Sequence, residues 1–217
     1  MMIDLAFFHT SPLHIASFES LLSELGVNIR REHVVDEDLL VEVQIKGEEG
    51  IKEKLFEALA EVLMRARVVL CTCSSLSPLA ESCDPRIIRL DRAMAQKAVS
   101  YSAQKSSKLA LIATLGTTLD ISSQLILEEA AKADFNLKLD SYLIPQAWQA
   151  FSQGEVKQYQ QCIRDFLAGP RWQAYDALVL AQASMAAAFQ DEPSPYTLFS
   201  SPRLGLEAAL DRLNLPS

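Results

Sequence analysis

Two apolar segments of this chain end in small polar residues, and only one of them carries a cysteine at that place. In the first segment, Cys73 follows an apolar run that begins at Val68, and in the second, Gln182 follows the run from Leu178 to Ala181. A thiol can accept and donate a proton, whereas a carboxamide at neutral pH only donates and accepts hydrogen bonds. The pattern predicts two half-sites, of which one carries an acid or base and the other an orienting group.

Parallel strands are expected to position both places. Polar residues at the point where a buried strand leads into a helix lie beside free N–H groups, where an anion can bind. The predicted strands form two series of four and cover residues 3–8, 27–35, 68–72, 87–90, 109–113, 135–143, 178–181 and 196–199. Helices are predicted over residues 15–25, 51–63, 119–132, 156–167 and 204–213, and a linker over 191–195. This alternation predicts two α/β lobes with parallel sheets.

The composition limits the possible classes of function. A chain of 217 residues with 49% apolar content can bury a substantial core. The net charge of −8 and the lack of a basic stripe argue against nucleic-acid binding. No apolar run reaches the ~20 residues that cross a bilayer, and no basic segment precedes the apolar start of the chain, so we expect neither a membrane span nor a signal peptide. Four cysteines without a pairing pattern indicate reduced thiols and a cytoplasmic protein.

Metal and nucleotide sites find little support in the sequence. Cys71 and Cys73 are separated by one residue, whereas metal and redox pairs usually have two residues between the cysteines. His9, His14 and His33 share no metal-ligand spacing, and neither GxGxxG nor GxxxxGK[ST] occurs. We therefore predict no metal site and structural histidines, except that His9 ends the first strand near the expected crevice and is a candidate second base.

Several motifs occur together in the order of a known protein superfamily. The loop after the first strand reads Phe8-His9-Thr10-Ser11, and the motif strings that follow it are Cys73-Ser74-Ser75, Ala113-Thr114-Leu115-Gly116-Thr117 and Ala181-Gln182-Ala183-Ser184. Two further strings are HVVDEDLL, from His33, and SSPRLG, from Ser200. In combination and over most of the chain, they resemble the aspartate/glutamate/hydantoin racemase superfamily, in a branch with a TCSS-type first motif and a VLAQASMA-type second motif.

The resemblance implies a two-lobed fold. Each lobe would hold a roughly four-stranded parallel sheet flanked by helices, the lobes would be related by a pseudo-twofold axis, and the active site would lie between them. The C-terminal helix of the superfamily returns to the first lobe. We therefore expect residues 1–97 and 199–217 to form the first lobe and residues 98–198 to form the second. A homodimer is the expected assembly, because dimers are the commonest oligomers.

The resemblance also implies a chemistry that needs neither pyridoxal phosphate nor a metal. In two-cysteine members, one thiolate removes the proton α to a carboxylate and the other thiol donates a proton to the opposite face. Here Gln182 replaces the second cysteine, so we expect a racemase-like or isomerase-like enzyme with Cys73 as its single thiol acid/base, partly ionised at a helix N-terminus. Cys71 is expected in the core. The catalytic candidates are Cys73, Gln182 and His9. The candidate substrate-binding residues are Thr10, Ser11, Ser74, Ser75, Thr114, Gly116, Thr117, Ala183 and Ser184.

Two alternatives remain open. A lyase that decarboxylates an activated malonate needs one proton donor, and arylmalonate decarboxylases also keep one of the two cysteines, although they keep the other one. A binding protein for small carboxylates that has kept the cleft and lost racemisation is the second alternative. In every case the expected ligand is a small carboxylic or amino acid.

Overall fold

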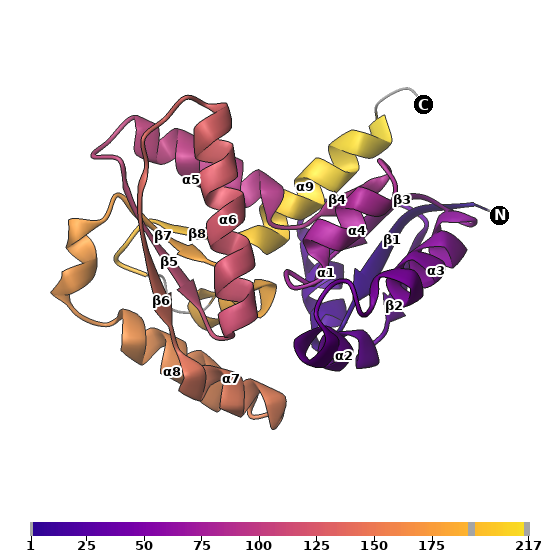
Figure 1. Ribbon diagram of the computed structural model, residues 1–217, viewed down its shortest axis with the longest axis horizontal. Helices are drawn as coiled ribbons and strands as arrows, with labels where there is room; N and C mark the ends of the chain where they lie inside the picture. The colour runs from indigo at the N-terminus through magenta and orange to yellow at the C-terminus, as the bar shows by residue number, and fades with distance from the viewer. Residues whose placement is uncertain (1, 191–193, 215–217) are drawn as a thin grey trace. The chain divides into compact units, whose positions relative to one another are not determined.

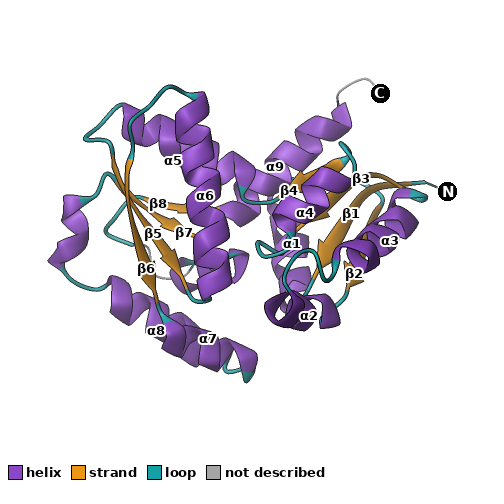
Figure 2. Cartoon of the chain, viewed as in Figure 1, coloured by secondary structure: helices purple, strands orange, loops and turns teal. Residues whose placement is uncertain are grey.

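The computed structural model describes residues 2–190 and 194–214 (Figure 1). The chain divides into two compact units: unit 1 comprises Met1–Asp91 and Pro202–Ser217, and unit 2 comprises Arg92–Ser201. Each unit contains a four-stranded parallel sheet flanked by helices (Figure 2), which confirms the predicted fold class of two α/β lobes. The observed division differs from the predicted one at residues 92–97 and 199–201.

Unit 1 has the strand order β2-β1-β3-β4, and all neighbouring strands are parallel. Its elements are β1 (Ile3–His9), α1 (Leu13–Glu24), β2 (Arg31–Val35), α2 (Asp38–Lys46), α3 (Lys52–Leu63), β3 (Ala66–Cys71), α4 (Ser77–Cys83), β4 (Ile87–Arg89) and, apart from its first residue, α9 (Ser201–Asn214). The central strands β1 and β3 are almost wholly apolar and buried, as strands covered on both faces must be.

Unit 2 repeats this order with β6-β5-β7-β8, again all parallel. Its elements are α5 (Arg92–Ala103), β5 (Lys108–Ala113), α6 (Gly116–Lys132), β6 (Lys138–Leu143), α7 (Pro145–Ser152), α8 (Val156–Leu167), β7 (Ala177–Leu180) and β8 (Leu198–Ser200), with 3-10 helices over Pro170–Ala174 and Ala183–Phe189. Helix α5 contacts α6 and the strands β5, β7 and β8, and for this reason residues 92–97 belong to unit 2.

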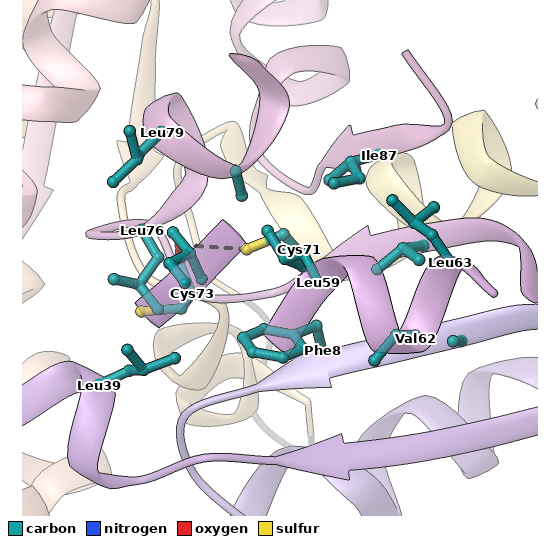
Figure 3. Close-up of a cluster of buried hydrophobic side chains, with 14 of the residues drawn as sticks. Phe8, Leu39, Leu59, Val62, Leu63, Cys71, Cys73, Leu76, Leu79 and Ile87 are labelled. Atoms are coloured by element: carbon teal, nitrogen blue, oxygen red, sulfur yellow. Dashed lines mark hydrogen bonds between the residues drawn. The ribbon is translucent and has the colours of Figure 1, made fainter. Parts of the chain in front are cut away.

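The side chains of β1 alternate between the two faces of the sheet in unit 1. Phe8 belongs to a buried cluster with residues of α2, α3 and α4 (Figure 3), whereas Phe7 contacts Phe18 of α1 on the other face, with ring centroids 5.1 Å apart. Helix α3 contributes Leu55 and Leu59, which lie one turn apart and are fully buried. Burial of one leucine contributes about 1.5–3 kcal/mol. This packing fixes the carboxyl end of β1 in place.

The C-terminal helix α9 joins unit 1 through a close backbone approach. A Cβ atom on Gly205 would lie 2.3 Å from the carbonyl oxygen of Leu90, so only glycine fits at this crossing. Arg203 of the same helix also forms an ion pair with Glu24 of α1. A glycine in the SSPRLG string therefore has a packing role.

All predicted strands and helices are present, and β2 and β6 are shorter than predicted. Four further helices, α2, α4, α5 and α7, were not predicted. The buried face of α5 consists largely of small residues, including Ala95, Ala98 and Ser102, whose periodicity is weak. Helix α4 has seven residues and begins at Ser77, directly before a proline. Of the predicted linker, residues 191–193 lie outside the described residues.

Candidate functional site

The two sheets present equivalent pairs of strand ends. In unit 1, Phe8 of β1 pairs with Cys71 of β3, and in unit 2, Ile112 of β5 pairs with Leu180 of β7. The positions two residues beyond these partners are occupied, in the same order, by Thr10, Cys73, Thr114 and Gln182. Each half-site therefore combines a threonine from one central strand end with either the cysteine or the glutamine from its neighbour.

The sulfur of Cys73 is surrounded by hydrogen-bond donors. The hydroxyl of Thr10 and the backbone N–H groups of Ser75 and Leu76 donate to it. The chain turns directly after β3, before α4 begins at Ser77, and the N–H of Leu76 also donates to the carbonyl oxygen of Cys73 at 3.1 Å. Three donors at one sulfur stabilise the thiolate form whenever the proton leaves.

Cys73 nevertheless lies in an apolar environment. The residue is 8% exposed, and Figure 3 shows its sulfur on the Leu39 side of the buried cluster, turned away from the sulfur of Cys71. Burial raises the pKa of the Cys73 thiol above its ordinary value, and the negative charge of Asp91 adds to this, against the effect of the three donors. The prediction of a partly ionised thiol is therefore wrong, because lost hydration outweighs the hydrogen bonds. At neutral pH Cys73 is a thiol that can donate a proton.

Cys71 is a core residue, as predicted. It is fully buried, and its thiol points to the carbonyl oxygen of Cys73 at 3.9 Å. Burial, together with the proximity of Cys73, raises the pKa of Cys71 to about 12. The same carbonyl oxygen accepts a hydrogen bond of 2.8 Å from the hydroxyl of Ser77, so this group fixes the backbone of the cysteine loop.

The remaining predicted residues of unit 1 lie in the loops that follow β1 and β3. Thr10, Ser11, Ser74 and Ser75 are all buried, with 8% exposure or less. The hydroxyl of Ser11 accepts the backbone N–H of Leu13 at 3.4 Å and so faces the start of α1. Of these residues, Thr10 and Ser75 contact the Cys73 sulfur itself.

His9 is fully buried on the face of β1 opposite to Phe8. Both of its ring nitrogens have partners: Nδ1 lies 2.7 Å from the hydroxyl oxygen of Thr72, and Nε2 lies 2.8 Å from Nδ1 of His33. Burial, with smaller contributions from His14 and His33, lowers the pKa of His9 to about 3. His9 is therefore a neutral imidazole held between two neighbours, and its use as a second base stays a prediction.

The hydrogen bonds of His9 continue to the surface of unit 1. Nε2 of His33 lies 2.9 Å from a carboxylate oxygen of Glu19, and Arg31 binds this carboxylate with two nitrogens, at 2.7 and 2.5 Å. The bond from Arg31 is the main reason why the pKa of Glu19 falls to about 2. All three histidines of the chain thus lie in unit 1, where the rings of His9 and His14 are stacked at 6.0 Å.

In unit 2, Gln182 holds Thr114 with both ends of its amide. Its Oε1 accepts the backbone N–H of Thr114 at 2.8 Å, and its Nε2 donates to the hydroxyl of Thr114 at 2.7 Å. Gln182 is 9% exposed and Thr114 is 2% exposed, so both bonds are buried. The N–H of Thr114 is thereby used within the unit, and Gln182 is a clamp between β5 and β7.

Tyr159 of α8 extends this network and was not singled out by sequence reasoning. Its hydroxyl bonds to Thr114 and lies 2.7 Å from the hydroxyl of Ser184. Burial raises the pKa of Tyr159 to about 12. The sequence signal was a hydroxyl on the apolar face of α8, where Ile163 and Leu167 follow at helical spacing.

Three predicted residues of unit 2 have less distinctive surroundings. Gly116 is the first residue of α6, and Thr117, which follows it, is exposed. Ala183 is buried at the start of a 3-10 helix. The structure thus brings Thr114, Gln182 and Ser184 into one hydrogen-bonded group through Tyr159. It records no such link for Gly116, Thr117 or Ala183.

A buried ion pair lies beside the cysteine strand. Arg89 of β4 binds Asp91 through two nitrogens, at 2.7 and 3.0 Å, and the side chains are 4% and 1% exposed. Arg89 pairs with Cys71 in the sheet, which accounts for the effect of the Asp91 charge on the nearby thiols. Opposite charges two residues apart, at the end of a short strand and just after it, were the available signal.

Within residues 2–190 and 194–214, no group of three or more His, Cys, Asp or Glu side chains is arranged to hold a metal ion. Over the same residues, no helix combines the length and apolar character needed to span a membrane.

The fold of the chain is similar to that of solved racemases. A glutamate racemase isoform from Bacillus anthracis has a TM-score of 0.69 at 15% identity, covering 98% of this chain and 82% of that one. For an aspartate racemase from Picrophilus torridus the values are 0.68, 14%, 99% and 95%, and for an allantoin racemase from Klebsiella pneumoniae 0.54, 14%, 98% and 88%. Neither a protein-family model nor a curated protein matches the chain. These likenesses show the fold that the sequence resemblance implied.

Proposed function

We propose that this protein is a cofactor-independent enzyme that transfers a proton at the carbon α to the carboxylate of a small acid, as racemases and isomerases do. Cys73 is its single thiol acid/base. The observation that carries the proposal is the sulfur of Cys73 at the end of β3 with three hydrogen-bond donors around it, on a fold shared with racemases.

The proton transfer at Cys73 can be written without any other redox or covalent partner. When a thiolate accepts the α-proton, the electron pair of the C–H bond moves into the carboxylate and forms an enediolate. The resulting thiol returns a proton to the same carbon. The hydrogen bonds from Thr10, Ser75 and Leu76 stabilise the sulfur while it carries the charge.

The replacement at Gln182 restricts the stereochemistry. An amide neither gives up nor takes a proton at neutral pH, and both ends of this one are bound to Thr114. Thr114 is held by Gln182 and Tyr159, so in unit 2 the hydroxyl of Ser184 is the donor that remains for a carboxylate. We expect proton exchange on one face of the substrate.

A second candidate reaction is decarboxylation of an activated malonate, and the raised pKa of Cys73 favours it. In that reaction carbon dioxide leaves, the electron pair of the broken C–C bond forms the enediolate, and the Cys73 thiol donates its proton to the carbon. A neutral thiol is ready for this step, whereas removal of an α-proton first requires the thiolate.

The substrate class is proposed from the fold and the half-sites together. Racemases of the same fold are named for glutamate, for aspartate and for allantoin, so the fold alone does not select the substrate. We propose a small carboxylic or amino acid. The free cysteines at 71, 73, 83 and 162 support the proposed cytoplasmic location, and a homodimer stays a prediction.

The direct test is exchange of the α-proton with solvent. The protein is incubated in D2O with malonate, phenylmalonate and both enantiomers of aspartate, glutamate and lactate, and α-deuterium and carbon dioxide are measured. We expect one acid to react and the rate to fall about 10²–10⁴-fold in Cys73→Ala, the usual contribution of a general acid or base.

The matched control is Cys162→Ala, which removes a half-buried thiol from α8 in the other unit. It should keep the wild-type rate. Binding of one acid without exchange or decarboxylation would replace the enzyme by a carboxylate-binding protein. A rate that survives in Cys73→Ala would contradict the role of the thiol.

A further inference from the structure

The direction of each hydrogen bond at Gln182 is fixed by the groups involved. A backbone N–H can only donate, so Oε1 of Gln182 must be the atom that faces the N–H of Thr114. The Nε2 group is thereby turned to the hydroxyl of Thr114, to which it can only donate. The oxygen of Thr114 is an acceptor in this bond, and its own proton is left for another partner.

Tyr159 and Ser184 continue the chain in the same direction. The Thr114 hydroxyl bonds to the Tyr159 oxygen, and the Tyr159 hydroxyl lies 2.7 Å from the oxygen of Ser184. Thr114 is 2% exposed, so a proton turned away from Tyr159 would need another buried acceptor. Ser184 is half-buried and can donate to a bound ligand. The arrangement with every oxygen satisfied runs from Gln182 through Thr114 and Tyr159 to Ser184.

We propose that this chain directs the hydroxyl proton of Ser184 to the carboxylate of the bound acid, and that Tyr159 is a positioning residue for that contact. The inference rests on the proposed function, because it takes a small carboxylate as the ligand. It gives Gln182 a role in place of acid/base chemistry, because its amide sets the direction of the hydrogen-bond chain. It also assigns a binding role to a helix that no sequence motif covered.

Tyr159 is suited to this task by its surroundings. Its ring contacts Phe151, with centroids 5.1 Å apart, and lies in the buried cluster with Trp172 and Ile163, so its position is fixed by packing. Its pKa of about 12 keeps the hydroxyl protonated at neutral pH. A neutral hydroxyl both accepts and donates, as a link in a directed chain must.

The test is a double-mutant cycle on carboxylate binding. Malonate, aspartate and glutamate serve as probes in an NMR titration of the full chain, and the tightest of them is followed through the variants. Ser184→Ala removes the terminal donor, and we expect about tenfold weaker binding. Tyr159→Phe keeps the ring and removes the link, with an expected loss of about three- to tenfold. The double variant should bind no more weakly than Ser184→Ala, because Tyr159 acts through Ser184.

The controls separate positioning from folding. Tyr175→Phe removes a hydroxyl of the same unit that bonds to Tyr142 and Asp140, and it should leave the affinity unchanged. The diamide of malonic acid, which lacks the negative charge, should bind equally to wild type and Tyr159→Phe. Losses that add in the double variant, an affinity that neither single variant changes, or no binding of any of the three acids would each overturn the inference.

The outcome is distinguishable from a failure of the proposed function. If the probe binds and the cycle is non-additive but no acid acquires α-deuterium, Ser184 and Tyr159 form a carboxylate site in a protein without this activity. If deuterium enters and depends on Cys73 while the cycle is additive, the enzyme stands and the directed chain does not.

Discussion

In unit 1 the hydroxyl of Thr10 donates to the sulfur of Cys73, and in unit 2 the hydroxyl of Thr114 accepts a hydrogen bond from Gln182. The two threonines occupy equivalent places at the ends of β1 and β5. The same arrangement of strand ends thus holds, in one sheet, a group that can transfer a proton and, in the other, a group that can only orient its neighbours. The comparison teaches that the sheet determines where the half-sites lie, whereas one side chain in each determines what it can do.

The surroundings of Cys73 and Gln182 also differ. The Cys73 sulfur lies against an apolar cluster that raises its pKa, whereas Gln182 belongs to a chain of polar groups that ends at Ser184. An apolar environment favours a neutral thiol that is ready to donate a proton. A directed chain of hydroxyls favours an anion.

The largest expected effect comes from the buried ion pair between Arg89 and Asp91 of unit 1. Arg89 pairs with Cys71 in one sheet, and Ser200 pairs with Leu180 at the equivalent place in the other. Arg89→Met leaves the carboxylate of Asp91 buried and uncompensated, which should lower the free energy of unfolding by about 3–5 kcal/mol in urea titrations.

The control for this prediction is a variant in which both partners of the ion pair are replaced. Replacing both partners, as Arg89→Met with Asp91→Leu, should recover much of the lost stability, because no unpaired charge remains. Ser200→Ala should change stability by less than about 0.5 kcal/mol. If Arg89→Met were as mild as Ser200→Ala, the ion pair would have no part in fixing β4.

A smaller effect is expected at the clamp of unit 2. Gln182→Leu leaves the buried N–H of Thr114 without its acceptor, which should cost about 1–3 kcal/mol of unfolding free energy. Gln158→Leu, at an exposed position of α8, is the matched control and should be nearly neutral. Cys73→Ala should affect the proton-transfer rate far more than Gln182→Leu does. The reverse order of effects on rate would invert the assignment of the two half-sites.

The smallest effect concerns the change of stability between pH 7 and pH 5, the range in which histidines titrate, and all three histidines lie in unit 1. His9 has a folded pKa of about 3 against an ordinary value of 6.5, so the folded state takes up this proton less readily than the unfolded chain. The contribution of neutral His9 to the free energy of unfolding is complete above about pH 6.5 and is lost as the pH falls toward 3. Between pH 7 and pH 5 we expect a loss of about 1–2 kcal/mol through His9 in urea unfolding followed by circular dichroism.

The comparison variant is His9→Asn, which cannot titrate and should lose correspondingly less stability between these two pH values. Both tryptophans, Trp148 and Trp172, lie in unit 2, so their fluorescence reports the unit without histidines. An equal pH dependence in wild type and His9→Asn would show that the buried imidazole does not contribute. Protonation of Glu19, whose folded pKa is about 2, lowers the stability only below about pH 4.5.

Sequence reasoning predicted the fold because its signals are local. Apolar runs such as 68–72 and 178–181 mark central strands, and periodicity at Leu55 and Leu59 marks the helix that covers one of them. The same signals predicted that Cys73 and Gln182 end equivalent strands. Helices with small or short buried faces, such as α5 and α4, carry little of this signal and were missed.

The site was predicted less completely because its properties arise from contacts across the sheet. The pKa of Cys73 depends on the apolar residues packed around it, which a motif at residues 73–75 does not contain. Tyr159 meets Thr114 and Ser184 only after α8 packs on the sheet. His9 lies on the face of β1 away from Phe8, and its partners His33 and Thr72 come from two other segments.

The most direct measurement for the account is the configuration of the product that one thiol makes in D2O. With the acid found by the exchange assay, solvent deuterium should enter on a single face and give one enantiomer, at a rate that depends on Cys73. Deuterium on both faces in the wild type, at a rate unchanged by Cys73→Ala, would contradict it, since an acid or base other than this thiol would then carry the reaction.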